Sequence, residues 1–110
     1  MKFIKDTPLL EAFDLKDLLK EVEAEREVKI LCENEAVTLF VQALDEGVEI
    51  PEHSPPGEVF LHLLEGEVNI LMGEQSINVS EGQTLVMHAH EPRKLFAVKK
   101  SKFMLLLIKG

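Results

Sequence analysis

Residues 68–79 read VNILMGEQSINV, and apolar and polar side chains alternate along much of this stretch. Alternation with a period of two is typical of a β-strand that buries one face. The two halves are separated by Gly73-Glu74, a two-residue connection that favours a tight hairpin turn. The stretch therefore predicts an antiparallel hairpin between Val68–Met72 and Gln75–Val79.

Short apolar runs separated by turn residues continue on both sides of this hairpin. The separators include Asp45-Glu46-Gly47, Pro55-Pro56-Gly57 and Glu81-Gly82. Many short strands at this spacing indicate an all-β fold, an antiparallel sandwich or barrel. The other predicted strands are Val28–Cys32, Ala36–Leu44, Val59–Leu64, Thr84–His88, Lys94–Val98 and Phe103–Ile108.

The first 27 residues carry a different pattern. Asp14 can cap a helix, and the apolar residues after it follow the i, i+3, i+4, i+7 spacing of one helix face. We expect a short amphipathic α-helix that packs on the barrel, so that residues 1–27 form an N-terminal helical segment and residues 28–110 the barrel domain. The apolar stripe of this helix consists of Leu15, Leu18, Leu19 and Val22.

Length, charge and cysteine content exclude several classes of function. A chain of 110 residues suits one domain, and its net charge of −8 disfavours binding to nucleic acid or to an anionic membrane. The single Cys32 excludes an internal disulfide. No stretch resembles a signal peptide or a membrane span, so the expected location is the cytoplasm.

The segments around Gly47 and Gly82 carry a family resemblance. Residues 47–57 read GVEIPEHSPPG and lead to Gly66, and residues 82–93 read GQTLVMHAHEPR. In these stretches the chain resembles the two sequence motifs of the cupin superfamily, and outside them it is similar to small bacterial and archaeal RmlC-like (cupin_2) proteins. The resemblance implies a cupin double-stranded β-helix, a barrel of the jelly-roll type.

The resemblance also implies where a metal would sit, because most cupins hold one with three His and one Glu. Only His53 survives among these positions, since the other three hold Pro55, Val59 and Arg93. Pro and Val side chains cannot ligate a metal, and a protonated Arg repels a cation. We therefore expect no cofactor and a metal-independent pocket that binds a small molecule. Whether the protein is an enzyme stays open, and no residue is assigned a catalytic role.

Two interpretations of Arg93 remain open. If its side chain points into the pocket, the guanidinium and His53 could together bind a carboxylate or another small organic anion. If it points outward, it forms an ordinary exposed ion pair with Glu91 or Glu58.

The histidines leave an alternative function. His88-Ala89-His90 is a His-x-His pair that, in an extended segment, would place both rings on one side. With His53 it could form a relocated site for a divalent transition metal, in a metal-binding protein or a metalloenzyme. The competing interpretation is that His88 and His90 are exposed loop residues.

An outward apolar stripe predicts self-association. If Val59, Leu61 and Leu63 face the barrel interior, Phe60, His62 and Leu64 face outward and need cover. A second copy of the chain or the N-terminal segment could supply it, and we expect a homodimer. A further alternative is a structural or regulatory dimer whose pocket is closed by side chains.

Overall fold

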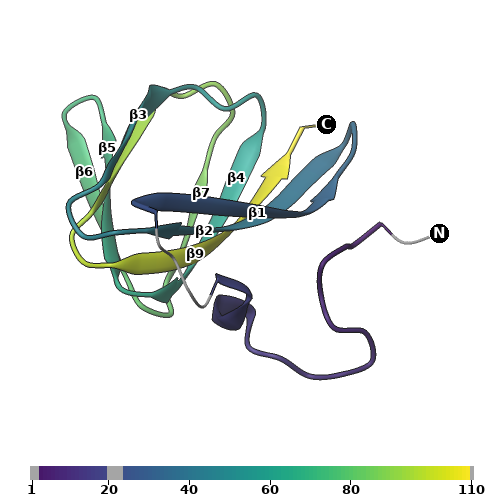
Figure 1. The fold of residues 1–110 in the computed structure, drawn as a ribbon. Coiled ribbons are helices and arrows are strands. Elements are labelled where there is room, and N and C mark those ends of the chain that lie inside the picture. The colour runs from purple at the N-terminus through teal and green to yellow at the C-terminus, as the bar shows by residue number, and fades with distance from the viewer. Residues whose placement is uncertain (1–2, 20–23, 110) are drawn as a thin grey trace.

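The computed structural model describes residues 3–19 and 24–109. Within these ranges the chain forms one short 3₁₀ helix, η1, and nine β-strands (Figure 1). No helix in the described part is long and apolar enough to cross a membrane. The elements are η1 Leu15–Leu19, β1 Arg26–Glu33, β2 Val37–Leu44, β3 Glu49–His53, β4 Glu58–Glu65, β5 Glu67–Met72, β6 Gln75–Ser80, β7 Thr84–Met87, β8 Arg93–Ala97 and β9 Ser101–Ile108.

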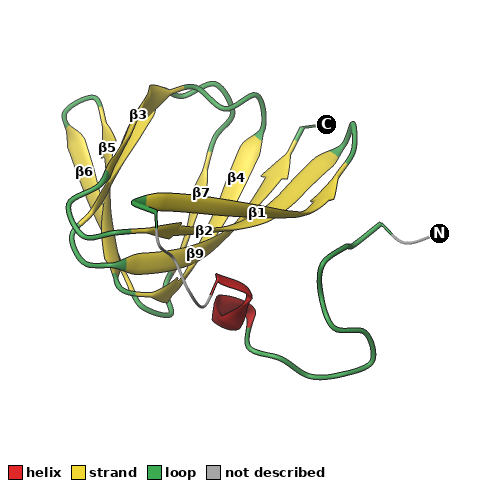
Figure 2. Ribbon diagram, viewed as in Figure 1, coloured by secondary structure: helices red, strands yellow, loops and turns green. Residues whose placement is uncertain are grey.

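The strands form two antiparallel sheets that face each other (Figure 2). One sheet has five strands in the order β1-β2-β9-β4-β7, and the other has four in the order β3-β8-β5-β6. Alternate side chains of both sheets meet in one core, in which Leu61, Leu63, Val68 and Phe103 have no measurable exposure. The structure confirms the all-β, antiparallel barrel that the sequence predicts.

The hairpin predicted between Val68–Met72 and Gln75–Val79 is present. Strands β5 and β6 pair from Met72↔Gln75 at the turn to Val68↔Val79. Gly73 in the turn has φ +60°. This conformation favours glycine, because the Cβ atom of any other residue would crowd the backbone there. The turn residues and the alternating pattern therefore agree with the observed register.

Strand β3 is the one strand that the sequence pattern missed. It contains Pro51 and exposes every residue except Ile50, so it has neither an apolar run nor a β-branched cluster. It forms as the edge strand of its sheet, where a proline is tolerated because one side of the strand needs no hydrogen-bond partner. Pairing with β8, rather than local propensity, places this strand.

The predicted N-terminal α-helix is wrong. Among residues 3–19 and 24–109, only the five residues of η1 are helical, and they form a 3₁₀ turn in which the Asp17 amide donates to the Asp14 carbonyl at 2.9 Å. Val22, the last residue of the predicted stripe, lies outside the described residues. So short a segment cannot offset the cost of helix nucleation alone, and its packing on the sheet decides its conformation.

The outer face of the five-stranded sheet is only partly covered. Leu19 of η1 packs on Leu31, Val41 and Ala43, over β1 and β2. As the alternation predicts, β4 turns Phe60 outward, and Phe60 pairs with Val86 of β7 and Leu106 of β9. Phe60 is 39 % exposed and Val86 62 %. Together with Ile108, these two residues form an uncovered apolar strip, which we name the outer strip.

Residues 3–13 form an arm that extends beyond the barrel (Figure 1). Close to its start the Lys5 amide donates to the Leu31 carbonyl of β1 at 2.8 Å. The apolar side chains of the arm are largely exposed: Phe3, Ile4, Leu9, Leu10 and Phe13. These apolar side chains are therefore open to solvent rather than packed on the barrel.

Candidate functional site

A cavity of about 380 Å³ lies inside the barrel, between the two sheets. Alternation along the strands produces it, because Leu61, Phe103 and Leu95 all turn toward the interior. Most of the lining is aliphatic, aromatic or proline. The side chains in the lining that carry polar groups are Arg26, Gln42, His53 and Arg93. The cavity can therefore take an apolar molecule and contact it with a few polar groups.

The four positions that correspond to the usual cupin ligands all line this cavity. They are His53, Pro55, Val59 and Arg93. His53 and Arg93 are register partners across β3 and β8, so the structure brings these two predicted ligand-binding residues together. At the other two positions the cavity wall is apolar.

Arg93 lies in the protein interior, with 3 % of its surface exposed. Its Nε donates to the Glu91 carbonyl at 3.1 Å and its Nη2 to the His88 carbonyl at 2.6 Å. The interpretation of Arg93 as an exposed surface pair is therefore wrong. The guanidinium instead holds the turn that precedes its own strand.

The third nitrogen of the guanidinium is unsatisfied. Nη1 of Arg93 is buried and has no hydrogen-bond partner. Burial lowers the pKa of Arg93 from its ordinary value, and the charge of Glu91 partly opposes this decrease. Both facts mean that the positive charge is poorly solvated, so an acceptor brought to Nη1 would stabilise it strongly.

His53 lies at the exposed rim of the cavity. Its Nδ1 is 3.0 Å from the Pro51 carbonyl. A carbonyl oxygen can only accept, so Nδ1 carries a proton and Nε2 is the ring nitrogen left for another partner. The ring can thus accept a hydrogen bond through Nε2 when neutral, or donate one when protonated.

His88 and His90 do not lie in an extended segment. Strand β7 ends at Met87, and the next residues form a turn in which His90 has φ +63° and its amide donates to the Pro55 carbonyl at 2.8 Å. Both side chains are exposed, and neither lines the cavity. In the part of the chain that the structure describes, no three His, Cys, Asp or Glu side chains are arranged to hold a metal ion.

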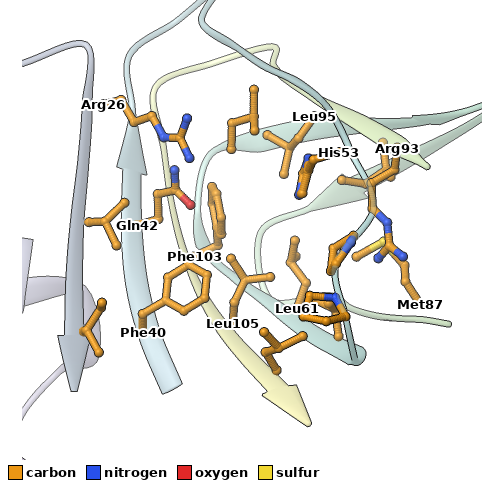
Figure 3. Close-up of a pocket in the computed structure, with 18 residues that line it drawn as sticks. Arg26, Phe40, Gln42, His53, Leu61, Met87, Arg93, Leu95, Phe103 and Leu105 are labelled. Atoms are coloured by element: carbon orange, nitrogen blue, oxygen red, sulfur yellow. The ribbon is translucent and has the colours of Figure 1, made fainter. Parts of the chain in front are cut away.

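Gln42 is the site residue that the sequence reasoning missed. It lies in β2, is 2 % exposed and lines the cavity, and its Nε2 is buried without a partner. Figure 3 shows its amide facing Arg26 on the β1–β2 side of the cavity. A signal was present, since Gln42 has the same parity as Phe40 and Leu44 and interrupts an apolar run.

The comparisons with known proteins agree on the fold. No protein-family model matches the chain, and no curated protein matches it. Among solved structures it is similar to a conserved protein of unknown function from Streptococcus pyogenes, at 29 % identity and TM-score 0.94, over 100 % of this chain and 96 % of that one.

Two further structures carry a family name. A cupin superfamily protein from Desulfitobacterium hafniense has TM-score 0.91 and 19 % identity, over 97 % of this chain and 98 % of that one. An RmlC-like cupin protein from Desulfovibrio desulfuricans has TM-score 0.71 and 26 % identity, over 96 % and 97 %. With the two motif segments and the two-sheet barrel, these matches identify the chain as a small RmlC-like cupin barrel protein.

Proposed function

We propose that this protein binds a small organic anion in its barrel cavity, without a metal, through Arg93 and His53. The observation that carries the proposal is Arg93, a buried residue in the lining of a mainly apolar cavity, whose Nη1 has no hydrogen-bond partner. A carboxylate would supply the missing acceptor and counter-charge. The apolar lining would contact the rest of the ligand.

The charge of the whole chain makes a local cation necessary for such a ligand. With a net charge of −8, the protein repels anions at long range. Inside the barrel, however, the surroundings are mainly apolar, so a charge–charge contact is weakened less than at the surface. Removing the charge of Arg93 would therefore weaken the binding of the anion more than removing the charge of any exposed Lys.

The size of the cavity supports binding over a closed barrel. About 380 Å³ is within the range of sites that enclose small molecules, roughly 300–1,000 Å³. A barrel filled by its own side chains would leave no such volume. The alternative of a structural dimer with a closed pocket is therefore the weaker one.

We also propose that the protein is a homodimer. The support is the outer strip, together with the exposed apolar arm of residues 3–13. Two-fold pairing would let each chain cover the apolar surface of the other. The outer strip lies on the opposite side of the sheet from the cavity, so dimer formation and ligand binding can be tested separately.

Protein purified without an affinity tag should carry a small organic acid and less than one transition metal ion per chain after gentle chelation. Mass spectrometry of the molecules released on denaturation, with metal analysis of the same sample, checks both. One tightly held metal ion per chain would contradict the metal-independent site proposed here.

A further inference from the structure

Gln42 places in the barrel an amide whose buried Nε2 has no hydrogen-bond partner. Its neighbours on the same face of β2 are Phe40 and Leu44, and its Nε2 has no partner. A buried amide without a hydrogen bond lowers stability, so an apolar residue of similar size would suit the free protein better. A residue that is unfavourable for folding and lines a cavity indicates a role in binding.

Arg26 lies next to this amide. Val28 pairs with Gln42 and Arg26 with Leu44 across β1 and β2, so Arg26 and Gln42 are diagonal neighbours on one face. Figure 3 shows the guanidinium directed toward the amide. Arg26 is exposed at the cavity rim, and the one salt bridge among the described residues, Lys99 with Glu67, does not involve it. The pair therefore presents a cation at the rim and an amide in the interior.

This polar pair is on the other side of the cavity from Arg93. Gln42 comes from β2 in the five-stranded sheet, whereas Arg93 comes from β8 in the four-stranded sheet. Figure 3 shows Arg26 and Gln42 on one side and Arg93 beside Met87 on the other, with apolar side chains between them. The cavity thus has two polar ends and an apolar middle.

We propose that Gln42 and Arg26 form a second anion-binding subsite and that the ligand is a linear dicarboxylate with an aliphatic middle. This proposal rests on the anion-binding function proposed above. One carboxylate contacts Arg93, and the other accepts from the Gln42 amide and lies near the charge of Arg26. The amide can turn about its last torsion, which is soft, to direct an N–H group at the ligand.

Matched pairs of acids test the second subsite on the intact protein. The probes are adipate, suberate and sebacate, each compared with the monocarboxylate of equal length: hexanoate, octanoate or decanoate. At the length that fits the cavity, the dicarboxylate should bind about tenfold more tightly or better, because it gains charge-assisted hydrogen bonds. Calorimetric titration measures the ratio of the dissociation constants.

Variants assign this difference to the two residues. Gln42→Met should remove the advantage of the dicarboxylate, keep the binding of the monocarboxylate, and raise the melting temperature of the free protein. The matched control Gln75→Met, at an exposed position on β6, should change none of these. Arg26→Gln should also reduce the advantage, whereas Lys29→Gln on the opposite face of β1 should not. Because Arg26 is exposed, Arg26→Gln and its control Lys29→Gln should fold. This pair therefore tests the second subsite even if Gln42→Met does not fold.

Two outcomes separate this proposal from the one on which it rests. If dicarboxylate and monocarboxylate bind equally, or if both Gln42→Met and Arg26→Gln match the parent, the second subsite is wrong, while monocarboxylate binding lost in Arg93→Met would still support the first. If the parent binds none of the acids, the anion-binding function itself is wrong.

Discussion

Arg93→Met is expected to abolish the stabilisation of this protein by small carboxylates. A ligand at a hundred times its dissociation constant stabilises the native state by about 2.7 kcal/mol. For a domain of this size, that corresponds to a rise in melting temperature of about 10 °C. Methionine fills much of the space of the arginine stem but cannot pair with a carboxylate, so the shift should fall to near zero. Thermal unfolding with and without ligand, for each variant, measures it.

The Arg93 variants need controls because this residue also holds a turn. Losing the hydrogen bonds to the His88 and Glu91 carbonyls should lower the free energy of unfolding by about 1–3 kcal/mol without any ligand. For each variant, the melting temperature with ligand is therefore compared with the melting temperature of the same variant without ligand. Arg93→Lys keeps the charge but not the planar donor geometry, so a small shift should remain. Lys94→Met, which removes an exposed charge from the same strand, should keep the full shift. An undiminished shift in Arg93→Met would show that the anion binds elsewhere.

Phe60→Glu is expected to convert a dimer into a monomer. The outer strip exposes Phe60 beside Val86, and a carboxylate buried there in an interface would lose its hydration without gaining a partner. The fold should survive, because Phe60 faces outward while Val59 and Leu61 fill the core. Light scattering at micromolar concentration should give twice the chain mass of 12.4 kDa for the parent and that mass for the variant.

Phe96→Glu is the matched control for this substitution. Phe96 is 36 % exposed, a fraction similar to that of Phe60, but it lies on the outer face of the four-stranded sheet. This variant should remain dimeric. A monomeric parent would remove the case for a dimer. A parent and Phe60→Glu variant of equal mass, both dimeric, would place the interface away from the outer strip.

The sequence predicts the barrel well where a strand buries one face. Along β4 and β5 the apolar parity is the observed inward parity, because the core selects it. The prediction from sequence fails where tertiary contacts decide the conformation. Strand β3 is recognisable only through its partner β8, and η1 is a 3₁₀ turn because the sheet beneath it, not helix propensity, sets its shape.

The site is predictable in part for the same reason. The motif positions identify His53 and Arg93 as cavity residues, and strand parity would have added Gln42. The hydrogen bonds of Arg93 could not be foreseen, because its acceptors are backbone carbonyls of the turn at 88–91, whose shape depends on contacts such as that between the His90 amide and Pro55. Sequence patterns place side chains on faces of strands, but they do not give the direction of loop carbonyls.

The central claim is that the barrel cavity binds an organic anion through Arg93. A crystal structure of the protein with the carboxylate that gives the largest rise in melting temperature tests it most directly. The account predicts the ligand inside the barrel, with a carboxylate oxygen within hydrogen-bond distance of Arg93 Nη1 and the aliphatic part against Leu61 and Phe103. A cavity that holds only water, with the carboxylate bound on the outer surface of the protein, would contradict it.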